Sequence, residues 1–209
     1  MTTTQNPTAP GAVIRRVADD TEPIGSLLVN PGGPGASGYD LIADSALAVV
    51  GEPVSAANYN DPKQTVIAGS KAAVDKACEV LKGLGAKRAL PLPVSAPFHS
   101  SLMKPAAERL KAALADIDLA APRIPVVNNV DVAVESDPAR IRDALVRQAA
   151  GPVRWVECVQ AIRARGITHV IECGPGKALA GMTKRIDAEL VGASLYDPAT
   201  LAEVKALLA

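Results

Sequence analysis

The feature that most constrains the fold is an alternation of short apolar runs with longer amphipathic stretches from residue 54 onward. Short apolar runs bounded by glycine or proline are typical of strands, whereas apolar residues spaced three and four apart indicate the buried face of a helix. Strands that alternate with helices favour βαβ units, whose connected strands lie parallel. We therefore predict an α/β fold with a mostly parallel sheet flanked by helices.

The individual elements follow from the same pattern. The predicted strands cover 26–30, 54–59, 65–68, 89–94, 124–130, 169–173 and 191–195. The predicted helices cover 39–50, 71–84, 101–116, 137–149, 152–165, 177–189 and a last stretch that begins at Pro198. The piece at 54–94 is predicted to form a small α+β subdomain beside the main sheet. Ser70 directly precedes a helical stretch and is predicted to cap it, because serine hydroxyls accept bonds from free backbone N–H groups.

Composition narrows the class of partner. The 209 residues carry 22 basic and 22 acidic side chains, so no charge excess points to nucleic acid or to an anionic membrane. Aromatic residues make up only 2% of the chain while hydrophobic residues make up 48%, so the core is expected to consist of aliphatic side chains. The chain has three widely spaced cysteines, Cys78, Cys158 and Cys173. An odd number at this spacing favours neither a disulfide framework nor a zinc site.

The chain has no pattern that is typical of a membrane or secreted protein. No apolar run reaches the roughly 18–20 residues that a membrane-spanning helix needs. The segment at 1–10 is polar and uncharged, unlike a secretory signal. We therefore expect a cytoplasmic protein that binds neither membrane nor metal.

The candidate catalytic residue is His99, within the segment VSAPFHSSLM. This segment follows a predicted strand and precedes a predicted helix, where side chains point into a crevice more often than into a core. A single histidine in such a place is more often a surface or structural residue than a catalytic one. The surrounding sequence decides between these interpretations.

Several separate segments, in order and at matching spacing, resemble the malonyl-CoA–acyl-carrier-protein transacylases. They span residues 54–209 and include VSAANYNDPKQTVIAGS, GAKRALPLPVSAPFHSSLMKPAAERL, IPVVNNVD, IRDALVRQAAGPVRWVE and HVIECGPGKALAGMTKRI. The resemblance implies an acyltransferase of fatty-acid synthesis that uses malonyl-CoA and phosphopantetheinyl acyl carrier protein, with no cofactor. In this family a serine attacks the malonyl thioester, and a histidine first takes the serine proton and later activates the incoming thiol.

The resemblance assigns roles to three positions. His99 matches the histidine of the family, and the main-chain carbonyl of Gln148 matches the group that orients it, as an aspartate does in a serine triad. Phe98 matches a residue of the substrate pocket that is similar in malonyl-selective members and is often smaller in methylmalonyl-selective ones. These assignments predict a malonyl-selective site around the loop at 95–100.

The chain also departs from the family pattern. The nucleophilic serine of the family lies in a sharp G-H-S-x-G turn between a strand and a helix, and no G-x-S-x-G occurs in this sequence. The small subdomain resembles a ferredoxin-like unit whose first strand and helix are absent. We therefore identify no nucleophile, expect a partial acyltransferase fold that is inactive alone, and retain a non-catalytic remnant or binding fragment as an alternative.

Residues 23–50 resemble a different protein class. The segment LLVNPGGPGASGYDL is similar to the strand and oxyanion loop of α/β-hydrolase peptidases, whose backbone N–H groups face a developing oxyanion. A hydrolase fragment is therefore a third interpretation, whereas Ser37 is rejected as a nucleophile because a serine among glycines is usually a turn residue. The predicted domains are a loose arm at 1–22, a hydrolase-like segment at 23–52, a truncated ferredoxin-like subdomain at 53–95 and the acyltransferase part at 96–209.

Overall fold

The structure of the chain is a computed structural model that describes residues 24–30, 51 and 53–209. The predicted arm at 1–22, the glycine-rich loop and helix at 31–50, and Ser37 lie outside the described residues. Within the described part, no helix is both long enough and apolar enough to cross a membrane.

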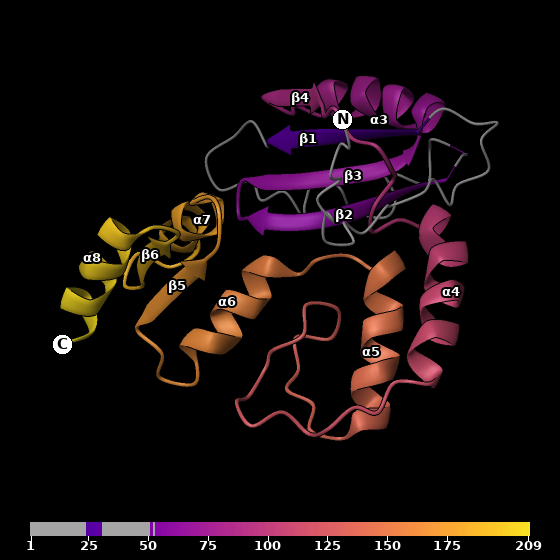
Figure 1. Ribbon diagram of the computed structural model, residues 1–209. Helices are drawn as coiled ribbons and strands as arrows, with labels where there is room; N and C mark the ends of the chain where they lie inside the picture. Colours follow the sequence, from indigo (N-terminus) through magenta and orange to yellow (C-terminus); the bar gives the residue numbers. More distant parts are fainter. Residues whose placement is uncertain (1–23, 31–50, 52) are drawn as a thin grey trace, which may run out of the picture.

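The larger sheet has four strands in the order β2-β3-β1-β4 (Figure 1). They are β1 (Ile24–Asn30), β2 (Val54–Asp61), β3 (Gln64–Ser70) and β4 (Arg88–Pro91). Every neighbouring pair in this sheet is antiparallel. The expected strand–strand–helix–strand succession at 54–94 is confirmed, although the last strand ends at Pro91 because Pro91 and Pro93 have no N–H to donate to a ladder.

β1 lies inside this sheet, between β3 and β4 (Figure 1). Leu28 is opposite Val66 of β3 on one side and Leu90 of β4 on the other. The resemblance implied a ferredoxin-like unit without its first strand. The strand predicted at 26–30 lies at this place in the sheet, and both neighbours pair with it.

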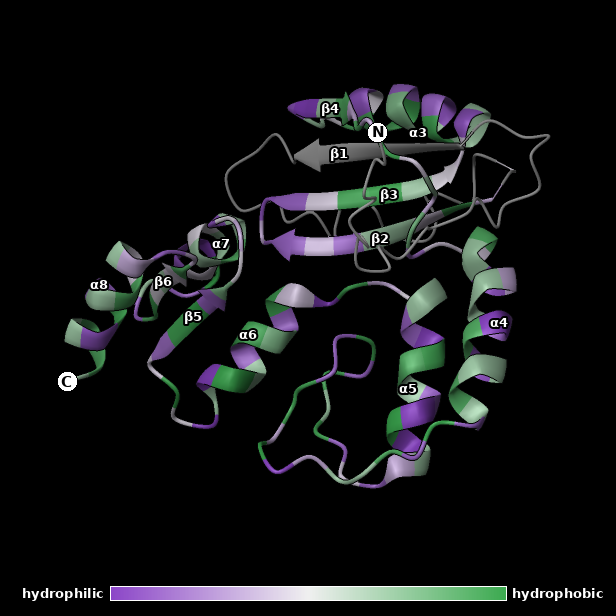
Figure 2. Ribbon diagram, viewed as in Figure 1, coloured by the Kyte–Doolittle hydropathy of each residue, from purple (hydrophilic) through white to green (hydrophobic). Residues whose placement is uncertain are grey.

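One face of the sheet is covered by helix α3 (Lys71–Gly83) (Figure 1). The predicted cap is confirmed, because the Ser70 hydroxyl accepts a hydrogen bond of 3.2 Å from the backbone N–H of Ala73. Beyond the helix, Gly85 has a φ of +94°, a conformation that glycine adopts without the strain that a Cβ would cause. The core between helix and sheet consists of small and aliphatic residues: Ile67, Ala73, Val74, Ala77, Leu81 and Ala89. Figure 2 shows the hydrophobic middle of β3 beneath α3.

Three further helices, α4 (Lys104–Ala115), α5 (Pro138–Ala150) and α6 (Trp155–Arg163), follow in the chain (Figure 1). The predicted helix at 101–116 begins with a 3₁₀ turn at Ser101–Met103 before α4. α5 packs against α4, where the guanidinium of Arg142 donates to the Leu114 and Ile117 carbonyls, both at 2.9 Å. The segment before α6 pairs with β2, since Val153 exchanges backbone bonds with Ala57 and Tyr59.

The C-terminal part is a small unit of two parallel strands and two helices. Its elements are β5 (His169–Cys173), α7 (Ala178–Ile186), β6 (Val191–Leu195) and α8 (Pro198–Leu208), and both strands have the predicted bounds. An ion pair of 2.7 Å between Arg185 of α7 and the buried Asp61 joins this unit to β2.

One prediction about strands needs correction. Residues 124–130 do not form a strand, because within the described chain their ladder consists of one bridge between Val127 and Val134. Ile124 and Val126 are 76% and 60% exposed, so this apolar run has no packing surface that would order a strand. Among the described strands, β5 and β6 pair in parallel, whereas the neighbouring strands of the four-stranded sheet are antiparallel.

Candidate functional site

His99 lies in the connection between β4 and the 3₁₀ turn at Ser101–Met103. Its φ is +60°, which is strained for a residue with a Cβ. The neighbouring residues hold this conformation from both sides. Pro97 is fully buried, and the hydroxyl of Ser100, itself 1% exposed, donates a 2.7 Å hydrogen bond to the Pro97 carbonyl. The half-buried imidazole is therefore held on an anchored turn.

Two main-chain carbonyl oxygens lie within hydrogen-bond distance of one nitrogen of this imidazole. Nδ1 of His99 lies 3.1 Å from the carbonyl oxygen of Gln148 and 3.1 Å from that of Gly151. Carbonyl oxygens only accept hydrogen bonds, so Nδ1 carries the proton and the neutral ring has its lone pair on Nε2. A histidine in this tautomer is a general base at Nε2, provided that a hydroxyl or thiol reaches it.

Both carbonyls belong to the last turn of α5 and its cap. The C-terminal carbonyls of a helix have no acceptor role within the helix and remain available to a side chain. Gly151 ends α5, and its N–H donates a 2.8 Å bond to the Arg147 carbonyl. The site therefore combines a histidine from one loop with a helix end that follows 49 residues later at Gln148.

An ion pair joins the last turn of α5 to the loop that precedes this helix. The Arg147 guanidinium donates to both carboxylate oxygens of Asp131, at 2.6 and 2.7 Å, and its Nε donates to Asp143 at 2.6 Å. The hydrogen bond from Arg147 holds the pKa of Asp131 below its ordinary value, and the two carboxylates raise the pKa of Arg147. Arg147 is therefore charged and directly precedes the residue whose carbonyl holds His99.

Phe98 is 37% exposed and precedes His99 in the same turn. An aromatic ring that is exposed next to a base is available to contact a bound molecule. The structure therefore leaves Phe98 accessible at the same end of the loop as the histidine.

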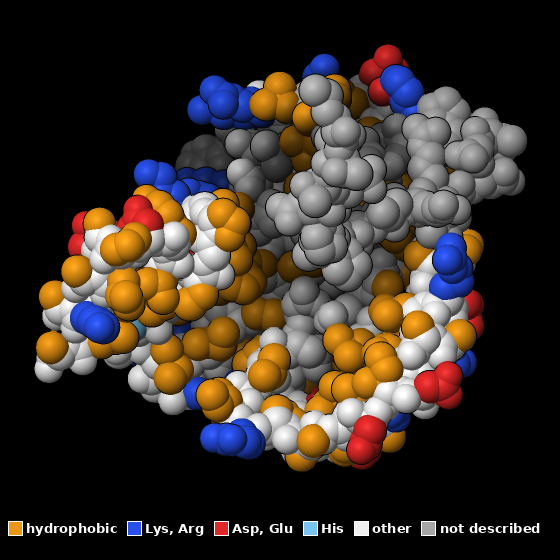
Figure 3. Space-filling view, in the orientation of Figure 1, with side chains coloured by type: hydrophobic (Ala, Val, Ile, Leu, Met, Phe, Trp, Pro, Cys, Tyr) orange, Lys and Arg blue, Asp and Glu red, His pale blue; other side chains and the backbone are white. Residues whose placement is uncertain are grey.

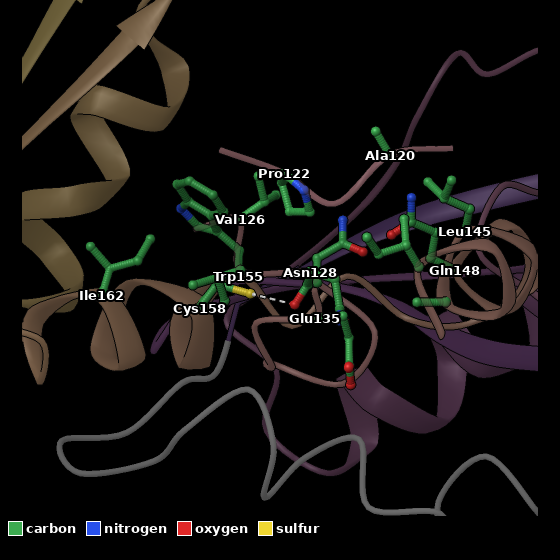
Figure 4. Close-up of a pocket in the computed structure, with 14 residues that line it drawn as sticks. Ala120, Pro122, Val126, Asn128, Glu135, Leu145, Gln148, Trp155, Cys158 and Ile162 are labelled. Carbon is green, nitrogen blue, oxygen red and sulfur yellow. Dashed lines mark hydrogen bonds between the residues drawn. The ribbon is translucent and has the colours of Figure 1, made fainter. Parts of the chain in front are cut away.

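An apolar pocket of about 400 Å³ lies next to the last turn of α5 (Figure 4). It is lined by residues of α5, of α6 and of the loop at 120–135. Gln148 lines it together with Val126 and Trp155. Cys158 of α6 also lines it, and its Sγ donates to the Asn128 carbonyl over 3.6 Å; burial raises the pKa of this thiol. Figure 3 shows hydrophobic side chains gathered around a hollow in the lower half of the view.

The other motifs of the sequence form no comparable site. Gly174 and Gly176 both have positive φ and turn the chain from β5 into α7. The Glu172 carboxylate accepts a 2.9 Å bond from the Ala180 N–H in the first turn of α7, so the helix start already has an anionic partner. Nδ1 of His169 lies 2.8 Å from the hydroxyl oxygen of the neighbouring Thr168. Among the described residues, no group of histidine, cysteine and acidic side chains has the arrangement of a metal site.

Sequence reasoning singled out His99, Phe98 and Gln148 but missed Gly151 and the Asp131–Arg147 pair. Asp131 lies in the quoted segment IPVVNNVD, and the other two lie in IRDALVRQAAGPVRWVE. Those segments contained the signal, but neither segment indicates that it folds against the other.

The family of this chain follows from a match to one family model. Residues 28–189 match the model described as the acyl transferase domain. The chain belongs to the acyl transferase domain family. The matched range begins inside β1 and includes only the end of that strand, residues 28–30.

Relatives of the acyl transferase family include well-matched bacterial proteins. The chain is 56% identical over 151 residues to the malonyl CoA-acyl carrier protein transacylase of Salmonella typhimurium, a match that covers 72% of this chain and 49% of that protein. It is 52% identical over 155 residues to the Escherichia coli protein of the same name, covering 74% of this chain and 50% of that one. The chain thus spans about half the length of these curated relatives.

Solved acyltransferases share its architecture. The acyl-carrier-protein S-malonyltransferase of Burkholderia pseudomallei 1710b matches with a TM-score of 0.80 and 59% identity, covering 88% of this chain and 58% of that one. A malonyl-transacylase in complex with a type II polyketide acyl carrier protein matches with a TM-score of 0.79 and 46% identity, covering 87% of this chain and 58% of that one. The described elements are therefore arranged as in solved members of the family.

Proposed function

We propose that this chain contributes the histidine-bearing part of a malonyl-CoA:acyl-carrier-protein transacylase. The observation that carries the proposal is the placement of His99 Nδ1 at 3.1 Å from the carbonyls of Gln148 and Gly151, which leaves Nε2 available as a base. Its support is the high identity to proteins named as malonyl CoA-acyl carrier protein transacylases. No observation favours the remnant or the hydrolase interpretation over this one.

The proposed reaction moves a malonyl group from one thiol to another in two steps. His99 Nε2 accepts the proton of a serine hydroxyl as the oxygen attacks the malonyl thioester, and the proton then leaves with the sulfur of coenzyme A. In the second step, Nε2 accepts the proton of the acyl carrier protein thiol as its sulfur attacks the acyl-serine. The proton returns to the serine oxygen when the new thioester forms. The two carbonyls keep the ring in the same tautomer before each transfer.

The serine of this scheme is not identified in the chain, because no G-x-S-x-G occurs in the sequence. We propose that the chain alone forms no malonyl-enzyme and that a serine-bearing segment completes the site. Phe98, exposed beside His99, is proposed to contact the malonyl group and to restrict the space for a larger acyl group.

The finer features of the fold belong to the same proposal. The order β2-β3-β1-β4 with α3 on one face supports a ferredoxin-like unit in which β1 is the first strand. We propose this unit as a subdomain at 53–95 completed by β1, with 96–209 as part of the main acyltransferase domain. β5 and β6 are proposed to belong to its mostly parallel sheet. The hydrolase-like origin of 23–52 and the loose arm at 1–22 stay predictions.

A chimera tests the function directly. It joins residues 54–209 of this chain to the part of the Salmonella typhimurium relative that precedes its matched segment, so that a serine-bearing half faces His99. We expect the chimera to transfer radiolabelled malonyl groups from coenzyme A to acyl carrier protein, and the chain alone to remain unlabelled. A folded chimera that transfers no malonyl group, or a chain that acquires a malonyl-serine alone, contradicts the proposal.

A further inference from the structure

Two residues of the described chain other than glycine have a positive φ, His99 at +60° and Val132 at +59°. This conformation is strained for a residue with a Cβ and persists where surrounding contacts impose it. β-Branched residues such as valine are rare in it. Both strained residues lie in turns that contact the last turn of α5.

The turn around Val132 is held by its own hydrogen bonds. The Asn128 side chain accepts a 2.7 Å bond from the Asp131 N–H and donates a 3.1 Å bond to the Ala133 carbonyl. The Val132 N–H donates to the Asn128 carbonyl at 3.1 Å. The strained turn therefore fixes where the Asp131 carboxylate points.

Asp131 then joins this turn to α5. Its two oxygens accept two parallel bonds from Arg147, at 2.6 and 2.7 Å, a geometry that specifies orientation as well as distance. The turn also packs closely on the helix cap, since a Cβ added at Gly151 would lie 3.0 Å from Cγ2 of Val130. The residue after Arg147 and the cap residue are the two that present carbonyls to His99.

We propose that Asp131 is a positioning residue for His99: through Arg147 it holds the last turn of α5, and with it the two carbonyl oxygens at Nδ1. The catalytic importance of that orientation rests on the proposed function. The positioning itself is a property of this chain without substrate. Asp131 touches no reacting atom in this scheme and acts only through the helix turn.

Asp143 provides a matched control. It accepts a bond of 2.6 Å from the same Arg147, but it lies on α5 itself and joins no second element to the helix. Asp131→Asn and Asp143→Asn each remove one carboxylate from the same guanidinium. Only Asp131→Asn releases the loop from the helix.

The test is the tautomer of His99, measured by ¹⁵N NMR of the imidazole nitrogens at alkaline pH. The chain has only two histidines, so His169→Gln assigns the signals. We expect wild-type and Asp143→Asn chains to carry the proton on Nδ1 of His99. In Asp131→Asn the Nδ1-protonated to Nε2-protonated ratio should fall by up to about fivefold, the range of an exposed ion pair.

Arg147→Lys keeps the charge but loses the two-pronged geometry, so it should shift the ratio in the same direction. If circular dichroism shows that Asp131→Asn does not fold, the ratio measured in Arg147→Lys tests the positioning role instead. Folded variants that keep the wild-type ratio overturn the positioning role, as does an equal shift in Asp143→Asn. A wild-type chain with the proton on Nε2 contradicts the carbonyl contacts themselves. Failure of the chimera to transfer malonyl groups, with the ratios as expected, contradicts the proposed function alone.

Discussion

At the scale of single residues, the imidazole of His99 depends on backbone geometry more than on other side chains. Its Nδ1 partners are the carbonyls of Gln148 and Gly151, which carry no formal charge. An aspartate in their place would stabilise an imidazolium, whereas carbonyls fix the tautomer without adding a charge. Substitution of Gln148 by another residue therefore keeps the carbonyl, provided that α5 stays intact.

Phe98 gives a prediction about acyl selectivity at this scale. Phe98→Ala in the chimera opens space beside His99, so the preference for malonyl over methylmalonyl groups should fall by roughly tenfold, the usual effect of about one methyl group in a pocket. The kcat/KM ratio for the two coenzyme A esters measures this. Ile117→Ala, at a residue that is 46% exposed after α4, is the control and should leave the ratio unchanged. An unchanged ratio in Phe98→Ala contradicts a role for Phe98 in the pocket.

At the scale of elements, the α3 core provides a prediction about stability. Leu81 is 1% exposed and packs between α3 and the sheet, whereas Leu84 at the helix end is 56% exposed. Leu81→Ala removes buried contacts and leaves a cavity, which should lower the free energy of unfolding by about 2–5 kcal/mol. Leu84→Ala should change it by less than about 0.5 kcal/mol. Urea unfolding followed by circular dichroism measures both, and similar losses would show that α3 does not pack as described.

The elements also show where sequence reasoning succeeds. The strands at 169–173 and 191–195 have their predicted bounds, because each apolar run has the other as a partner. The run at 124–130 has an equally apolar pattern but only one bridge, between Val127 and Val134. A periodic pattern reports the tendency to form a strand, whereas the strand itself needs a neighbour to complete its hydrogen bonds.

The candidate site was also predictable only in part. The segment around His99 and the carbonyl of Gln148 were found from the resemblance. Gly151 and the Asp131–Arg147 pair were not, because a contact between two loops depends on the path of the chain between them. The strain at Val132 leaves no trace in the sequence, because valine favours strands and rarely adopts a positive φ.

At the scale of the whole molecule, β1 determines whether the chain has a complete sheet. It lies between β3 and β4 and bonds to both. The strand itself is predicted at 26–30, but its place in this sheet is not. The segment around Leu28 resembles another protein class, while backbone pairing requires only an extended run of suitable length. The four-stranded sheet therefore depends on residues from both sides of the predicted domain boundary between residues 52 and 53.

Leu28→Pro tests the importance of β1 for the fold. Proline in an interior strand removes a ladder hydrogen bond and leaves a carbonyl without its partner, so the free energy of unfolding should fall by at least about 1–3 kcal/mol. Ala121→Pro, in a connecting segment outside helices and strands, is the matched control and should cost far less. Thermal unfolding by circular dichroism compares the two. Equal stability of both variants contradicts the interior position of β1.

The most direct test of the account is malonyl transfer by the chimera with each histidine replaced in turn. His99→Ala removes the base at Nε2, so kcat/KM for transfer to acyl carrier protein should fall by about 10²–10⁴-fold. His169→Ala removes the other histidine of the chain and should leave transfer within a factor of about two, as for a residue remote from the reacting atoms. Full transfer by a folded His99→Ala chimera, or an equal loss in His169→Ala, contradicts the assignment of His99 as the acid–base residue.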